Sequence, residues 1–361
     1  MIAPVMKALL LAGGFGTRLR PLTLDTPKPI VPLFDRPFIY HQIDLLKRVP
    51  EVDEVILSLN YQPDRIEAVV GRGDEAGLPV RYLVEPSPRG TGGAVKYAEP
   101  LLDGTTIVFN GDVLTEVDLA AVIDLHRTRG ARATIMLAPV PDPSAYGLVE
   151  TDVAGNVTRF IEKPDPEQIT SNTINAGVYV LEPDTFDRIP EGVKYSIERR
   201  FFPSLVERGE PFTAYIERGY WRDIGTPAAY LQGHRDILDG RCRSGCFTKN
   251  ARRDPTVVPG ATIDAGAQLR GPCFVGPDVT IGPDAQVGPY AVLGRGAHVG
   301  AAAVVRDSIV WPGSAIGPGA TLEGAIVGGR CRIGDHASLG PGVVLGDGST
   351  LTAYTRSAGP S

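Results

Sequence analysis

A six-residue period fills the last third of this 361-residue chain and limits the folds open to it. Apolar residues recur at every sixth position, and Gly, Pro and Asp crowd the positions between them. The period slips by one residue twice. The seventeen apolar positions on the resulting registers are Val257, Ile263, Leu269, Val275, Ile281, Val287, Leu293, Val299, Val305, Trp311, Ile316, Leu322, Val327, Ile333, Leu339, Leu345 and Leu351. A hexapeptide repeat of this length predicts a parallel β-helix.

The hexads have the form Ile/Val/Leu-Gly-Pro-x-Ala/Val-x, which resembles the left-handed triangular β-helix, where three hexads complete one coil. The resemblance implies roughly five to six coils in residues 257–361. The left hand is an exception to the usual rule for parallel crossovers. Because solenoid ends and flat faces associate readily, we expect a homo-oligomer and regard the β-helix as its contact surface.

The first 240 residues follow a different pattern, in which short apolar runs alternate with segments of helical periodicity. This alternation predicts an α/β fold with a mostly parallel, Rossmann-like sheet and helices on both faces. The predicted strands are residues 7–12, 54–59, 80–84, 106–109, 133–139 and 178–181. Ile39, Ile43 and Leu46 mark one helix, and residues 119–125 another. We predict one domain at 1–240, a linker at 241–256 and the β-helix at 257–361.

The first predicted strand runs into a glycine-rich turn that is followed by two cations. The residues expected to surround a polyphosphate here are Leu11, Ala12, Gly13, Gly14, Gly16 and Thr17. Glycines let backbone N–H groups approach phosphate oxygens, while Arg18 adds a planar fork of donors and Lys28 a point charge. Leu19 stands where a dinucleotide fingerprint needs its third glycine, and Gly-Lys-Ser/Thr occurs nowhere in the chain. The segment therefore predicts a polyphosphate site of another kind.

Composition excludes several classes of protein. The formal net charge of −6 argues against a nucleic-acid surface, which is normally basic. No apolar run approaches the ~20 residues of a membrane span, and the N-terminal run lacks the features of a signal peptide. The four cysteines, Cys242, Cys246, Cys273 and Cys331, are too scattered for a disulfide framework. We expect a cytoplasmic protein with reduced thiols and no nucleic-acid or membrane partner.

The glycine turn also carries a family resemblance. Gly-Gly-Phe-Gly-Thr-Arg-Leu-Arg-Pro-Leu-Thr, followed by Pro-Lys-Pro, resembles the signature of the sugar-1-phosphate nucleotidyltransferases. The Pro-Lys-Pro form looks most like that of the mannose-1-phosphate guanylyltransferases. The resemblance covers the catalytic region and the hexapeptide repeats, and it implies a nucleoside triphosphate and a hexose 1-phosphate as substrates.

In nucleotidyl transfer a sugar phosphate oxygen attacks the α-phosphorus in line, and pyrophosphate leaves. The nucleophile is already an anion, so catalysis depends on positioning and charge neutralisation rather than on a protein nucleophile. The resemblance implies that Arg18 and Lys28 stabilise the triphosphate and the departing pyrophosphate. It assigns to Lys163, in Phe-Ile-Glu-Lys-Pro, the contact with the sugar phosphate; the alternative for Glu162 and Lys163 is a surface ion pair.

Two carboxylates match the metal ligands of the family. Asp112 ends the segment Ile-Val-Phe-Asn-Gly-Asp at 107–112, and Asp223 precedes a turn in Tyr-Trp-Arg-Asp-Ile-Gly-Thr-Pro. An aspartate in such a position is commonly only a turn or helix cap. In the family context the pair implies Mg²⁺, which commonly takes one or two carboxylates together with substrate phosphates.

The remaining site residues are also assigned by resemblance. For the nucleoside they are Glu85, Gly90 and Thr91, with a plain loop and helix cap as the alternative. For the sugar they are Gly147, Glu162, Asn175 and Gly177.

Other functions compete with this one. An acetyltransferase in the β-helix would need a catalytic histidine, but His298 and His336 lie inside unbroken hexads, so we reject it. A non-catalytic regulatory subunit would be expected to lack a metal carboxylate or a phosphate cation, and none is missing. We favour transfer from GTP to mannose 1-phosphate, giving GDP-mannose and pyrophosphate. A glucose-1-phosphate thymidylyl-, uridylyl- or adenylyltransferase is the alternative.

Overall fold

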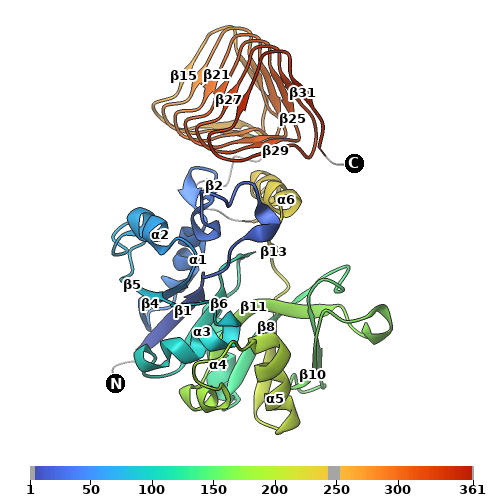
Figure 1. Cartoon of the computed structure of the whole chain (residues 1–361). Helices are drawn as coiled ribbons and strands as arrows, with labels where there is room; N and C mark the ends of the chain where they lie inside the picture. Colours follow the sequence, from blue (N-terminus) through green and yellow to red (C-terminus); the bar gives the residue numbers. More distant parts are fainter. Residues whose placement is uncertain (1–4, 243–252, 360–361) are drawn as a thin grey trace. The chain divides into compact units, whose positions relative to one another are not determined.

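The computed structural model describes residues 5–242 and 253–359 (Figure 1). The chain forms two compact units: the first comprises Met1–Gly14 and Gln42–Trp221, and the second Phe15–His41 and Arg222–Ser361. The segment that carries Arg18 and Lys28 therefore belongs to the same unit as the hexapeptide repeats. Cys246 lies outside the described residues, as do most of the residues predicted to form the linker.

The first unit is built on a nine-stranded mixed sheet with the order β10-β9-β11-β6-β1-β4-β5, and β8 joins β11 to β12. Its strands are β1 (Met6–Leu11), β4 (Val52–Leu59), β5 (Val80–Val84), β6 (Thr106–Asn110), β8 (Ala133–Pro139), β9 (Gly147–Thr151), β10 (Val157–Glu162), β11 (Thr173–Leu181) and β12 (Phe212–Ile216). Strands β5, β4, β1 and β6 are parallel neighbours, and β12 is parallel to β8. The predicted α/β sheet is confirmed, with antiparallel pairing added at β11 and in the β9–β10 hairpin.

Both faces of this sheet are covered. Leu9, Ile56 and Val108 belong to one hydrophobic cluster with residues of the helices, while Leu10 and Leu57, which alternate with them, are equally buried. The helices are α1 (Ile39–Leu46), α2 (Pro63–Val70), α3 (Gly90–Ala98), α4 (Leu119–Thr128) and α5 (Phe202–Glu207), with short turns η3 (Glu99–Leu101), η4 (Pro166–Gln168), η5 (Pro183–Arg188) and η6 (Ile197–Phe201). The short strand β7 (Val113–Thr115) also belongs to the first unit, and β13 (Trp221–Asp223) begins at the last residue of this unit and continues into the second.

The carboxyl ends of the parallel strands meet at one edge of the sheet. In β1, Leu11 pairs with Ser58 of β4 and Asn110 of β6, and Leu59 pairs with Val84 of β5. The residues that immediately follow these strands are brought to this edge. In open α/β sheets it is the edge where ligands bind.

The second unit contains a left-handed β-helix of three parallel six-stranded sheets. One sheet holds β14 (Pro255–Val257), β17 (Cys273–Val275), β20 (Val292–Leu293), β23 (Ile309–Val310), β26 (Ile326–Val327) and β29 (Val344–Leu345). The second holds β15 (Thr262–Ile263), β18 (Thr280–Ile281), β21 (His298–Val299), β24 (Ala315–Ile316), β27 (Arg332–Ile333) and β30 (Thr350–Leu351). The third holds β16 (Gln268–Leu269), β19 (Gln286–Val287), β22 (Val304–Arg306), β25 (Thr321–Glu323), β28 (Ser338–Leu339) and β31 (Arg356–Ser357). The repeat prediction is confirmed.

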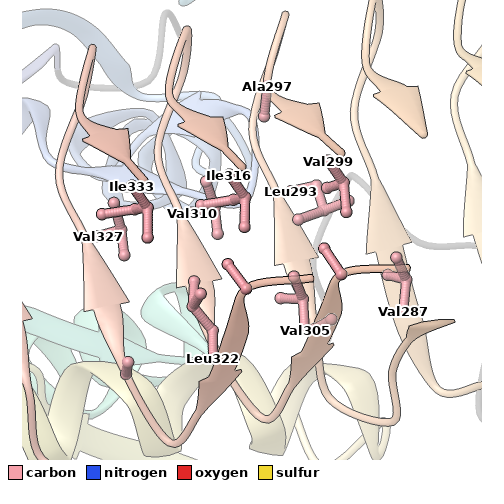
Figure 2. Close-up of a cluster of buried hydrophobic side chains, with 14 of the residues drawn as sticks. Val287, Leu293, Ala297, Val299, Val305, Val310, Ile316, Leu322, Val327 and Ile333 are labelled. Carbon is pink, nitrogen blue, oxygen red and sulfur yellow. The ribbon is translucent and has the colours of Figure 1, made fainter. Parts of the chain in front are cut away.

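One position of the predicted period is wrong. Val310, not Trp311, continues the interior ladder, because Val310 pairs with Leu293 and Val327 and lies in the buried cluster (Figure 2). The first slip therefore falls before Trp311. Trp311 is also buried, but its indole N–H donates to the hydroxyl of Tyr230 at 3.0 Å.

Tyr230 belongs to α6 (Pro227–Leu238). The Thr226 hydroxyl caps this helix by accepting from Ala229 N at 3.2 Å. Arg235 of α6 forms an ion pair with Asp307 of the β-helix. The rest of the second unit comprises η1 (Thr17–Leu19), η2 (Lys28–Ile30), β2 (Pro32–Leu33) and β3 (Arg36–Pro37). Of the helices in the described part of the chain, none is both long and apolar enough to cross a membrane.

Candidate active site

At the carboxyl edge of the first unit, Gly13 lies in a narrow space. A Cβ on Gly13 would be 3.2 Å from the backbone nitrogen of Asn60 and 3.5 Å from Oε1 of Glu85. Glu85 is 6% exposed, and its carboxylate accepts from the Ser58 hydroxyl at 2.8 Å and from Arg89 N at 2.9 Å. Glu85 therefore braces the loop after β5 next to the glycine turn.

Asp112 follows β6 on a turn that is fixed at both ends. Gly111 N donates to Leu11 O at 3.1 Å, and a Cβ on Gly111 would lie 2.7 Å from that oxygen. The buried Gln42 amide donates to Asn110 O at 2.9 Å and to Val113 O at 3.1 Å. Sequence reasoning missed Gln42. Its only signal was a polar residue beside the apolar face of the predicted helix.

The glycines that follow β5 pack closely against another segment of the chain. A Cβ on Gly90, whose φ is +70°, would lie 2.8 Å from Tyr195 O, and one on Gly92 would lie 2.9 Å from the Tyr195 ring. The Thr91 hydroxyl donates to Glu198 at 2.7 Å and accepts from Ile197 N at 2.9 Å. Residues 195–198 therefore pack closely against this loop, and the nucleoside contact of Gly90 and Thr91 stays a prediction.

The residues predicted for the sugar lie on three neighbouring strands. Gly147 of β9 pairs with Glu162 of β10, and a Cβ on Gly147 would lie 3.0 Å from Glu162 Oε2. On β11, Asn175 donates to the Tyr179 hydroxyl at 2.9 Å and accepts from Gly177 N at 2.9 Å. These four predicted residues are brought together with Tyr179, which the sequence did not identify.

The residues predicted for the sugar also have charged and aromatic neighbours. Burial raises the pKa of Glu162, and the carboxylate of Glu198 raises this pKa further. Lys163 follows with φ +54° and donates its backbone N–H to Tyr146 O at 3.0 Å. The Tyr146 ring meets Trp221 edge-on at 5.4 Å, and the Trp221 indole donates to Ala176 O at 2.9 Å. An acid, a cation and two aromatic rings therefore border the strands of the predicted sugar site.

A second group of predicted residues lies in the second unit. Both terminal nitrogens of Arg18 lie 3.2 Å from Asp223 Oδ2, although the two residues are 205 positions apart. Asp223 Oδ1 accepts from Gly225 N at 2.6 Å, and a Cβ on Gly225 would lie 2.6 Å from Arg18. Gly16, with φ +63°, precedes η1, which contains Thr17 and Arg18, and a Cβ there would lie 3.3 Å from Lys28 Cβ.

Two of the predicted residues, one in each unit, carry side chains of a kind that can bind a divalent cation. Across residues 5–242 and 253–359, no three or more His, Cys, Asp or Glu side chains gather as a protein-only metal site. Asp112 and Asp223 both present oxygen, the ligand type that hard cations prefer, and Mg²⁺ commonly adds phosphate oxygens and water to one or two carboxylates. Within the second unit, the Asp223 carboxylate already attracts one cation, the guanidinium of Arg18.

Comparisons with known proteins identify the family of the chain. Residues 7–240 match the family described as Nucleotidyl transferase, and residues 269–355 match the GMPPB C-terminal domain. The mannose-1-phosphate guanylyltransferase of Mycobacterium tuberculosis is 42% identical over 275 residues, with 75% of each chain covered. The mannose-1-phosphate guanyltransferase of Saccharomyces cerevisiae is 37% identical over 269 residues, with 73% of each chain covered.

Among solved structures, HddC from Yersinia pseudotuberculosis, complexed with GMP-PN, is 31% identical with a TM-score of 0.55. The match covers 64% of this chain and 99% of that chain. The predicted likeness to the mannose-1-phosphate guanylyltransferases is confirmed. The chain belongs to the nucleotidyl transferase family and is an enzyme of that class with a C-terminal β-helix.

Proposed function

We propose that this chain joins GTP and mannose 1-phosphate to give GDP-mannose and pyrophosphate. A mannose 1-phosphate oxygen forms a bond to the α-phosphorus, and the bond from that phosphorus to the bridging oxygen breaks. Pyrophosphate leaves with the electron pair. The observation that carries the proposal is the carboxyl edge of β1, β4, β5 and β6, where Gly13, Glu85 and Asp112 follow strand ends in a chain whose relatives are guanylyltransferases.

Each predicted residue has a role in this proposal. The backbone from Leu11 to Thr17 follows the triphosphate, with Gly13, Gly14 and Gly16 giving the N–H groups access to it. Arg18 and Lys28 neutralise the phosphates and the departing pyrophosphate. Lys163 aligns the attacking phosphate, Glu85, Gly90 and Thr91 border the nucleoside, and Glu162 and Asn175, with Gly147 and Gly177, border the mannose.

Nucleotidyltransferases generally use a divalent metal, and we propose Mg²⁺ held by Asp112 and Asp223. When bound, this ion would neutralise charge on the phosphates. The Asp223 carboxylate that would hold the metal also forms an ion pair with Arg18 within the second unit. Neutralising Asp223 would therefore affect both cations.

The proposal extends to the setting of the reaction. Cys273 and Cys331 are free and buried, which fits a reducing compartment, and we place the enzyme in the cytoplasm. We also propose that it forms a homo-oligomer. Light scattering coupled to size exclusion tests this on the full chain: a mass above 38.4 kDa is expected, and a monomer at micromolar concentration contradicts it.

The experiment that tests the function is a grid of GTP, dTTP, UTP and ATP against mannose, glucose and galactose 1-phosphates, scored by pyrophosphate release. We expect kcat/KM for GTP with mannose 1-phosphate to exceed that of every other pair by at least about tenfold, or ~1.4 kcal/mol. A preference for dTTP with glucose 1-phosphate would replace the proposed substrates. Folded protein that turns over no pair would instead be a regulatory subunit.

A further inference from the structure

Within the second unit, the segment that carries Arg18 and Lys28 is attached to a corner of the β-helix. The Thr26 hydroxyl donates to Asp347 Oδ2 at 2.8 Å, and Asp347 lies at the corner that follows β29. At the same corner, a Cβ on Gly346 would lie 3.2 Å from both Cβ and O of Pro21. The corner thus contacts the segment at two places, five residues apart in the sequence.

This attachment reaches the predicted phosphate-binding residues through short links. The buried Thr23 hydroxyl donates to Gly16 O at 2.8 Å, and a Cβ on Gly16 would lie 3.1 Å from Thr23 Cγ2. Thr23 lies between the two contacts of the corner, and Gly16 is two residues from Arg18. On the other side, Thr26 is followed by Pro27 and then Lys28, which begins η2. Both cations are therefore within two residues of a fixed point of the segment.

Asp347 forms hydrogen bonds outside its own coil. Its Oδ1 accepts from Gly329 N of the previous coil at 2.7 Å, while its Oδ2 faces Thr26 and lies 3.5 Å from the Arg330 guanidinium. The side chain is 5% exposed. Asp335 holds the matching position two corners earlier, after a strand of another sheet: its Oδ1 would lie 2.6 Å from a Cβ on Gly317, as Asp347 Oδ1 would lie 2.8 Å from one on Gly328. Asp335 is exposed and provides a matched control.

We propose that Asp347 is a positioning residue for nucleotidyl transfer: through Thr26 it fixes residues 16–28 in the geometry that binds the triphosphate. This inference rests on the proposed function in one respect, the roles of Arg18 and Lys28 on the triphosphate. It gives the β-helix a part in the reaction besides assembly. A hydrogen bond from a hydroxyl to a buried carboxylate is stronger than a neutral one, so its loss should be measurable as about a tenfold effect.

The test compares Asp347→Ala, Thr26→Val and the double variant with the full-length wild type. Pyrophosphate release is measured with whichever triphosphate and sugar 1-phosphate the wild type uses best. Each single variant is expected to lower kcat/KM for the triphosphate about tenfold, with KM for the sugar phosphate unchanged. The double variant should be no worse than either single one, because both remove the same contact. Thr26→Ser, which keeps the hydroxyl, should restore most of the activity, and Asp335→Ala should match wild type.

Two further readouts do not depend on turnover. Hydrogen exchange in peptides from residues 15–31 should be faster in Asp347→Ala and Thr26→Val, with exchange in β1 unchanged. Calorimetric titration with GTP should show about tenfold weaker binding in the same two variants. If the wild type prefers another substrate pair, the proposed function fails, but this comparison still decides the role of Asp347.

Several results would overturn the inference. They are unchanged exchange in residues 15–31, wild-type kinetics and GTP affinity in Asp347→Ala, an equal loss in Asp335→Ala, or additive losses in the double variant. A wild type that binds no triphosphate would overturn both proposals together.

Discussion

Replacing Tyr230 by phenylalanine should destabilise the second unit by about 2–4 kcal/mol, because one buried hydroxyl serves two other polar groups. Tyr230 is fully buried in α6. Its hydroxyl donates to Pro32 O and accepts from the Trp311 indole N–H at 3.0 Å. Phenylalanine would fill the same space but remove the partner of both groups, and each buried polar group left unsatisfied costs about 1–3 kcal/mol.

Trp311 itself can report the transition. The chain has two tryptophans, so a Trp221→Phe background leaves the emission of Trp311 alone. Urea unfolding in this background, with a slope of ~3 kcal/mol/M, should show a midpoint lowered by about 1 M for Tyr230→Phe. Tyr354→Phe removes a hydroxyl from a side chain that is 72% exposed, and we expect it to leave the midpoint unchanged. A change in Tyr230→Phe no larger than in this control would refute the reasoning.

Three other predictions follow from burial and charge. The Glu198 carboxylate helps to raise the pKa of Glu162, so Glu198→Gln should move the acid limb of kcat/KM for the sugar phosphate to lower pH. If the pH profile shows an unmoved acid limb, Glu162 has no part in sugar binding. Burial lowers the pKa of His234 to about 4, so below pH 6.5 the unfolded chain binds more protons than the folded chain. The free energy of unfolding should therefore fall by about 3 kcal/mol as the pH drops from 6.5 through 4, and urea titrations should show a shallower fall in His234→Gln. Burial raises the pKa of Cys273 to about 12, so its thiol should react with a disulfide reagent at pH 8 only after denaturation, as mass mapping of the labelled cysteine would show.

The sequence was sufficient wherever an apolar run or period decided the structure alone. Strands β5 and β8 have the predicted bounds, and the interior ladder of the β-helix follows the predicted hexads except near Trp311. There two adjacent apolar residues, Val310 and Trp311, competed for one interior position. The choice depends on Tyr230, which is 81 residues away, so no local pattern could resolve it.

Part of the candidate site was equally beyond local patterns. Gly90 and Gly92 signal a close approach of backbone, but the sequence does not say to what, and Tyr195 makes that approach within the chain. The pairing of Arg18 with Asp223, and of Thr26 with Asp347, joins segments about two hundred residues or more apart. Such contacts follow from packing within the second unit. The glycine turn and the carboxylate that follows β6, in contrast, are local signals, so the sequence alone can predict them as site residues.

The central claim, that Asp112 supports nucleotidyl transfer through a divalent cation, is tested most directly by pyrophosphate release from Asp112→Asn at saturating Mg²⁺. The amide keeps the shape of the side chain and removes its charge. We expect turnover to fall by at least about a thousandfold, with the thermal unfolding midpoint unchanged. Near-normal turnover in folded Asp112→Asn protein would contradict the account.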